Sequence, residues 1–274
     1  MATRTWIGGA GDWNSTNTAA WSGGAIPGTG DTAVFDGTSG SGTVVVDSPN
    51  GAGVVTVQSI TLGASAINLD FATNNNNVTL TAAPGLSFSG TGTRGLLAGT
   101  GTWTITVGSG GTAFTFGTMT NAGTVTLTGA TWIINGTGGK AVNFGAQSFG
   151  AMTWGADATG MFLMTGGAGT VASLAITAPL AISLAGGTLT VTAAPTWTGT
   201  SADKIWIETA NNNATKTTIA ISSGAPSLDW TVLRGLLFTG SVGTATNSIA
   251  HNVSTDITIT APSSGAGGAR VIGG

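Results

Sequence analysis

Short stretches in which apolar and hydroxyl side chains alternate run through most of this chain. In the sequence WTITV, Trp103, Ile105 and Val107 fall on one side and two threonines fall on the other. This period of two is typical of a β-strand with one buried face. Similar segments recur at 44–46, 78–80, 125–127, 180–184, 189–191, 205–207, 219–221, 228–232 and 257–259. No long apolar stripe with the helical period of about 3.6 residues accompanies them, so the pattern predicts an all-β protein.

The breaks between these segments are rich in Gly, Asn, Ser and Ala-Pro, which are turn-forming residues. Strands that recur at spacings of roughly 8–12 residues fit a sandwich, a barrel or a parallel β-solenoid. The breaks here are longer and more varied than the two-residue Asn-Gly turns of β-hairpins. This difference favours the solenoid.

The chain also resembles itself. Residues 71–97 and 208–237 share an Asn run, alternating Thr and aliphatic residues, Ala-Pro and Arg-Gly-Leu-Leu in the same order, and 190–200 is a third, partial copy. Such repetition is typical of stacked units that share one continuous core. We expect the Asn runs at 74–77 and 211–213 to form ladders of side-chain amides between successive turns.

Three zones follow from the distribution of residue types. Residues 1–43 are rich in Trp and Asp and are expected to form a cap or docking module. Residues 44–262 carry the alternating segments and are expected to form the solenoid. Residues 263–274 form a glycine-rich tail.

Composition supports this interpretation. The chain has 47 glycines and 50 threonines, both of which disfavour helix, and 41% of its residues are hydrophobic with a mean hydropathy of +0.34. A chain with this much apolar surface can bury a core and is not a disordered low-complexity segment. Charged residues are few, with seven basic and ten acidic side chains.

The charge pattern and the missing residue types exclude several classes of function. The net charge is −3 and the basic residues are scattered singly, so no nucleic-acid partner is expected. The chain has no cysteine, which excludes disulfides and thiolate sites. No apolar run approaches the roughly 18 residues of a membrane span, and no apolar stretch follows Arg4, so we expect neither a membrane partner nor an export signal.

The tryptophans of the first zone have two interpretations. They are expected to plug the open end of the solenoid, because a bare end exposes apolar side chains and unpaired strand edges. They are alternatively a platform for a sugar or a protein. Because binding energy concentrates on a few Trp and Arg anchors, we also predict that this zone docks onto a partner through Arg4, Trp6, Trp13, Trp21 and Phe35.

Residues for metal binding or for histidine chemistry are sparse. Four aspartates of the N-terminal part could supply oxygen ligands to a calcium ion, although capping of turns is the simpler role. They are Asp12, Asp31, Asp36 and Asp47. His251 is the only histidine, so neither a histidine metal cluster nor a Ser-His-Asp triad is expected, and we predict no cofactor.

An enzyme acting on polysaccharides remains an alternative. Glycoside hydrolysis needs a facing pair of carboxyl groups. Asp203, Glu208 and Asp229 are the candidates, and Trp206 and Trp230 are the aromatic residues near them in the sequence. The first two carboxylates are five positions apart, which places them on opposite faces of one strand or across a bend, so we expect a non-catalytic protein.

Two segments resemble a known class of proteins. The stretch WIGGAGDWNSTNTAAWSGGAIPGTGDTAVFDG is similar to the opening segment of many phage virion proteins and bacterial adhesins built on β-helices. The shared positions are Trp6, Trp13-Asn14, Trp21-Ser22, Pro27-Gly28 and the segment from Asp31 to Phe35. Residues 228–260 look like the final coils of right-handed parallel β-helices of phages. The fold that the resemblance implies is a right-handed parallel β-helix, or β-solenoid, with an N-terminal Trp-rich cap.

The resemblance implies a virion structural protein on the particle surface, such as a head decoration, a spike or a tail-fibre component. Its partners would be other virion proteins of the capsid or tail, with a homo-oligomer and a host-surface glycan as further partners to test. It would assemble in the host cytoplasm, which needs no export signal. A bacterial surface adhesin or carbohydrate-binding module is the alternative, since the same modules occur in both settings.

Overall fold

The parallel β-solenoid is confirmed by the structure, a computed structural model. It describes residues 2–88, 90–116, 123–165, 168–210, 216–253 and 256–262. Within these ranges the strands pair in parallel, and the helical content is limited to two 3-10 turns, η1 (Thr18–Ala20) and η2 (Ser22–Gly24). Neither turn has the length or the apolar character that a bilayer crossing requires.

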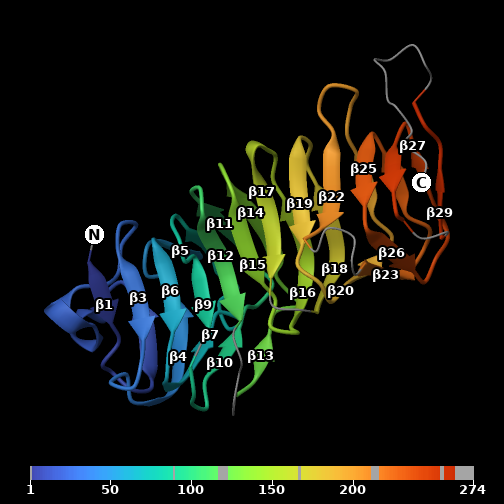
Figure 1. Cartoon of the computed structure of the whole chain (residues 1–274). Helices are drawn as coiled ribbons and strands as arrows, with labels where there is room; N and C mark the ends of the chain where they lie inside the picture. The colour runs from blue at the N-terminus through green and yellow to red at the C-terminus, as the bar shows by residue number, and fades with distance from the viewer. Residues whose placement is uncertain are drawn as a thin grey trace.

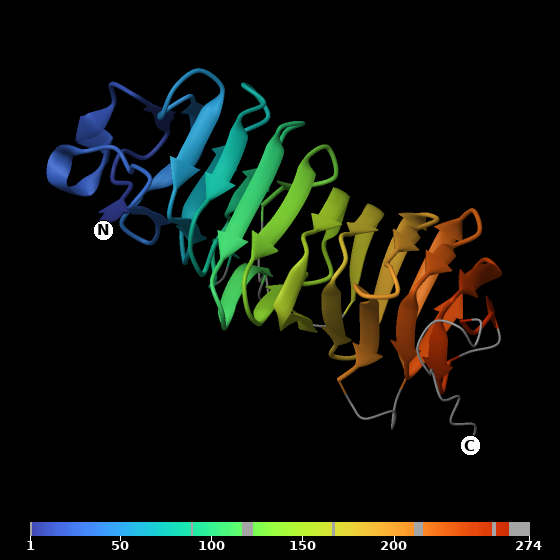
Figure 2. The same cartoon turned by 90° about the horizontal axis from the view of Figure 1, so that it is seen from above.

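One sheet, here called the long sheet, runs along the whole solenoid (Figure 1). Its eleven strands are β1 (Thr3–Thr5), β3 (Thr32–Phe35), β6 (Ser59–Leu62), β9 (Leu86–Phe88), β12 (Gly111–Phe116), β15 (Lys140–Asn143), β17 (Asp157–Thr165), β19 (Leu180–Leu184), β22 (Ile205–Thr209), β25 (Thr231–Arg234) and β28 (Ile249–His251). Ten steps at a strand spacing of about 4.8 Å give a rod of about 48 Å. Figure 2 shows the coils stacked along one axis.

A nine-stranded sheet forms the opposite side. Its strands are β5 (Val54–Val57), β8 (Asn77–Leu80), β11 (Thr102–Val107), β14 (Thr131–Gly136), β16 (Ser148–Trp154), β18 (Gly169–Ile176), β20 (Thr188–Ala193), β23 (Thr217–Ser223) and β26 (Leu236–Thr239). Apolar residues of both sheets face each other and fill the space between them.

Two shorter sheets complete the sides. The N-terminal sheet contains β2 (Gly11–Asn14), β4 (Ser41–Asp47), β7 (Ala66–Asp70), β10 (Gly95–Leu97) and β13 (Val125–Thr126). The C-terminal sheet contains β21 (Thr196–Thr198), β24 (Ser227–Asp229), β27 (Gly243–Thr246) and β29 (Ile257–Ile259). The third side also changes its place in the coil. It follows the long sheet in the first coils (β3, β4, β5) and follows the nine-stranded sheet in the later ones (β19, β20, β21).

The coils shorten where neither of these shorter sheets contributes. Phe114 in the long sheet pairs with Val142, 28 residues later. Val142 pairs with Met164 after 22 residues, and Met164 pairs with Leu184 after 20. The interval returns to 25 residues between Leu184 and Thr209, where the C-terminal sheet begins. The middle coils therefore have two strands, and the coils on either side have three.

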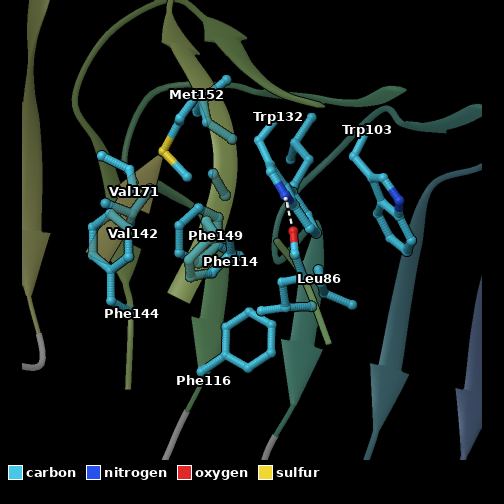
Figure 3. Close-up of a cluster of buried hydrophobic side chains, with 14 of the residues drawn as sticks. Leu86, Trp103, Phe114, Phe116, Trp132, Val142, Phe144, Phe149, Met152 and Val171 are labelled. Atoms are coloured by element: carbon cyan, nitrogen blue, oxygen red, sulfur yellow. Dashed lines mark hydrogen bonds between the residues drawn. The ribbon is translucent and has the colours of Figure 1, made fainter. Parts of the chain in front are cut away.

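The core consists of ladders of residues at equivalent places in successive coils. Trp103 and Trp132 are register partners in adjacent strands, so their rings stack 5.0 Å apart, close to the spacing of the strands themselves. The Trp132 ring also meets Phe149 edge-on at 5.1 Å, and its Nε1 donates to the carbonyl oxygen of Leu127 (Figure 3). Because the strand spacing is constant, aromatic residues at equivalent positions of successive strands stack on one another.

The internal repeats are only partly in phase with the coils. The strands after both Asn runs, β8 and β23, lie in the nine-stranded sheet. The Arg-Gly-Leu-Leu marks do not share a side, because Leu96 lies in the N-terminal sheet and Leu236 in the nine-stranded sheet. In contrast, Trp197 of the third copy and Leu228 are register partners. The two longer repeats are therefore similar in sequence, although some of their equivalent residues lie on different sides of the solenoid.

The first Asn run links coils, but by a different route from the amide ladder that we predicted. The Asn76 side-chain amide donates to the carbonyl oxygen of Val46 in the preceding coil at 2.7 Å. Asn75 Oδ1 accepts from the backbone N–H and the hydroxyl of Thr100 in the next coil, each at 2.9 Å. Side-chain amides thus satisfy backbone groups of the neighbouring turns. The second run, at 211–213, lies outside the described residues.

The zones of the sequence correspond to the structure in part. The boundary at residue 43 falls inside β4 (Ser41–Asp47), and β1 and β3 belong to the long sheet. The N-terminal zone is therefore continuous with the solenoid. The tail at 263–274 lies outside the described residues.

Candidate functional site

The N-terminal aromatic residues form a closed cluster over the first coil. Trp6, Trp13, Trp21 and Phe35 are all buried. Trp21 lies at the centre, with its ring 5.2 Å from that of Trp6, 5.1 Å from that of Trp13 and 5.5 Å from that of Phe35. Edge-to-face contacts of this kind add about 0.5–1.5 kcal/mol per pair beyond burial. The arrangement is that of the expected Trp-rich cap.

Burial limits what this cluster can do at a surface. None of its four rings is accessible, so a partner that docks at this end must contact other atoms. Of the five residues predicted to dock, only Arg4 reaches solvent, with 24% of its side chain exposed. Its Nε lies 3.7 Å from Asp31 Oδ2. Among the described residues Ile7 is the large apolar side chain exposed at this end, and it was not singled out from the sequence.

Two of the four aspartates of the N-terminal part hold turns. Asp31 accepts backbone N–H groups from Ala2 and Gly28, and Asp36 accepts from the N–H and hydroxyl of Thr38. Burial alone would raise the pKa of Asp31, but the two N–H donors and the Arg4 charge outweigh it and lower the pKa. Asp12 and Asp47 are exposed. Nowhere in the described ranges do three His, Cys, Asp or Glu side chains converge on a possible metal position.

The three carboxylates considered for hydrolysis do not lie on one face. Asp203 precedes β22 and Glu208 is near its end, and the strand rises about 10 Å between Ile205 and Glu208. Asp229 belongs to the C-terminal sheet, where its Oδ1 accepts from the hydroxyl of Thr246 and from two N–H groups. The observed roles are turn capping for Asp229 and surface pairing for Glu208.

A buried ion pair occupies the middle of the solenoid, and sequence reasoning did not find it. Lys140 Nζ donates to Asp157 Oδ2 at 2.6 Å, and both side chains are almost fully buried. Lys140 also donates to the carbonyl oxygen of Gly136 at 3.2 Å. Asp157 Oδ1 accepts from the N–H of Gly138 and from both the N–H and the hydroxyl of Thr159. Each charged group therefore has hydrogen-bond partners besides the other, which a buried pair requires.

We predict that this pair makes the stability pH-dependent. Burial alone would raise the pKa of Asp157, but hydrogen bonds from Lys140 and Thr159 and the Lys140 charge lower it from 3.8 to about 2. A depressed folded-state pKa contributes stability that is present above pH 4 and is lost as the pH falls toward 2, about 2 kcal/mol in all. Denaturant titrations between pH 6 and pH 2 measure it. Asp157→Asn should flatten the slope, leaving the smaller contribution of Asp31; an unchanged slope would contradict the assignment.

The outward face of the long sheet changes character along the solenoid. In the first coils it carries a column of short, mostly hydroxyl side chains in register: Val34, Thr61, Ser87, Thr115 and Asn143. In the later coils two columns replace it. One is Met161, Ala181, Trp206, Val232 and Ile249, and the other is Leu163, Ser183, Glu208, Arg234 and His251. Large apolar and charged side chains are thus confined to one half of this face.

A surface site with aromatic and charged side chains, here called the Trp206 patch, contains Trp206, Glu208, Arg234 and His251. Trp206 is 42% exposed, and its Nε1 donates to Glu208 Oε2 at 3.2 Å. Arg234 Nη1 lies 3.9 Å from the same oxygen. A shallow cavity of about 260 Å³ adjoins them and is lined by Trp206, Val232, Leu233, Arg234, Ile249 and His251. His251, noted in the sequence as the single histidine, therefore lines this cavity.

Comparison with known proteins gives no further identification. Neither the family models, nor the curated proteins, nor the solved structures contain a match to this chain.

Proposed function

We propose that this chain is a non-enzymatic structural protein displayed on the surface of a phage virion, as a head decoration, a short spike or a tail-fibre component. The observation that carries the proposal is the long sheet, which continues through eleven strands from Thr3 to His251. A rod of about 48 Å with one continuous core is suited to holding surfaces apart or presenting them at a fixed spacing.

The placement of the polar side chains supports a structural role. Asp31, Asp36, Asp157 and Asp229 all accept hydrogen bonds within turns or between coils. The carboxyl groups of a catalytic site instead face a cleft in which a substrate can reach them. The assignment to a virion comes from the resemblance of residues 6–37 and 228–260 to phage proteins, and a bacterial surface adhesin is the second candidate because the Trp206 patch is an exposed, aromatic surface.

Virion incorporation is tested directly by mass spectrometry of purified particles. We expect many copies of this polypeptide per particle. Particles that lack it would overturn the proposal.

The docking end is tested with two exposed aliphatic side chains at opposite ends of the rod. Ile7 is 53% exposed in the N-terminal zone and Val242 is 67% exposed beside the C-terminal sheet. If the N-terminal zone docks, Ile7→Glu should lower incorporation about tenfold or more, since an unpaired charge buried at an interface costs over about 1.4 kcal/mol. Val242→Glu is the matched control and should incorporate normally. The opposite result would place the anchor at the far end.

A further inference from the structure

Trp206 is the exception among the tryptophans. Seven of the nine lie in the core with almost no exposure, Trp230 is half-buried, and Trp206 is 42% exposed on the outward face of the long sheet. Burying an indole stabilises a fold more than almost any other side chain. Trp206, on the surface, therefore stabilises the fold less than each of the buried tryptophans does.

Hydrogen bonding fixes how the indole is presented. Trp206 and Glu208 are two residues apart on one strand, so both side chains project from the same face. The bond from Trp206 Nε1 to Glu208 Oε2 holds the ring by its edge, and the Arg234 guanidinium lies against the same carboxylate. The ring is therefore oriented in advance, and its exposed area is available for stacking.

The rest of the patch has the composition of a site for hydroxyl-rich ligands. Glu208, Arg234 and His251 are planar polar groups that follow one another in successive coils. The Glu208 and Arg234 charges oppose each other, so the patch has no large net charge. Sites for small ligands commonly combine aromatic or apolar side chains with a few polar groups that orient the ligand, and the Trp206 patch has both.

We propose that the Trp206 patch binds a neutral polysaccharide, with a hexopyranose ring stacked on Trp206 and its hydroxyls bonded to Glu208 and Arg234. The small number of exposed apolar side chains favours this ligand over a protein. Among the described residues only Met161 and Trp206 are large exposed apolar side chains on this face. A standard protein interface buries about 800 Å² per partner around a cluster of apolar anchors. A sugar chain needs only a strip along the coils.

The proposal deepens the surface-display role by naming a ligand, and it rests on that role for its biological setting only. The test uses the isolated full chain in affinity electrophoresis through gels containing dextran, mannan or laminarin, with alginate and hyaluronate as acidic probes. We expect retardation by at least one neutral polysaccharide, weaker retardation by both acidic ones, and a shift in tryptophan fluorescence on binding.

Two variants and one control identify the site. Trp206→Ala should weaken binding about tenfold or more, as expected of a central aromatic anchor. Glu208→Gln should weaken it less, because the amide oxygen still accepts from the indole. Thr61→Ala, on the hydroxyl half of the same face, should bind as the unaltered chain does.

Three results would overturn the proposal. They are failure of all three neutral polysaccharides to retard the chain, unchanged binding by Trp206→Ala, and a concentration-dependent dimer that Trp206→Ala abolishes, which would assign the patch to a second copy. Because the assay needs no particles, its failure leaves the virion role standing, whereas missing copies in purified virions would leave polysaccharide binding standing.

Discussion

Replacing Trp132 with alanine is expected to lower the free energy of unfolding by about 3–5 kcal/mol. The side chain is fully buried between Trp103 in the preceding coil and Phe149 in β16, the next strand of the nine-stranded sheet. Its removal leaves a cavity in the stack, which destabilises the fold, and removes one of the two hydrogen bonds that the Leu127 carbonyl oxygen accepts, the other coming from the N–H of Gly150. In Figure 3 the Trp132 side chain lies between Trp103 and the rings of Phe149 and Phe114.

Denaturant unfolding followed by circular dichroism measures this loss, and hydrogen exchange locates it. Protection should fall most in β11, β14 and β16, because each coil of a solenoid contacts only its neighbours. Trp206→Ala is the matched control, since it removes the same side chain from the surface, and it should change stability by no more than about 0.5 kcal/mol. Equal losses in the two variants would show that stacking at Trp132 does not stabilise the core.

The strands and the sides that they bury were predictable from the sequence. The alternation in residues 103–107 places Trp103, Ile105 and Val107 inward, and all three are buried. Local alternation suffices for this because, in a stack of parallel strands, residues at equivalent positions of successive strands point to the same side of the sheet. The aromatic cap was predictable too, since an open solenoid end must be covered.

The shape of the coils was not predictable. Nothing local in the sequence marks where the N-terminal sheet ends after β13 or where the C-terminal sheet begins at β21. The side that a strand joins is given by its parallel partners in the neighbouring coils, which its own residues do not identify. Leu96 pairs with Leu69 and Val125 in the N-terminal sheet, whereas Leu236 pairs with Thr217 in the nine-stranded sheet, although the sequences around them are similar.

The residues of the candidate sites were also only partly predictable from the sequence. Trp206 and Glu208 could be selected from the sequence as an aromatic residue beside an acid. Arg234 and His251 could not be added to them, because each lies in a later coil and joins the patch only through the register of β22, β25 and β28. The Lys140–Asp157 pair was missed because its members are 17 residues apart and meet inside the solenoid.

Replacing Lys140 with methionine is expected to cost about 3–5 kcal/mol, although it substitutes an apolar side chain for a charged one in the interior. The change leaves the Asp157 carboxylate buried without a cation. The pKa of Asp157 should then rise, and acid destabilisation should begin at a higher pH than in the unaltered chain.

Asp157→Asn is the complementary variant. It keeps an oxygen that can accept from Gly138 and Thr159, but it leaves the Lys140 ammonium unpaired, and it should also cost about 3–5 kcal/mol. The double variant, Lys140→Met with Asp157→Asn, removes both charges and retains the acceptor. It should therefore be more stable than either single variant, with a coupling energy of about 2–3 kcal/mol in urea titrations. Additive losses would show that the two side chains act independently, and that the hydrogen bonds to the backbone, rather than the ion pair, stabilise the middle coils.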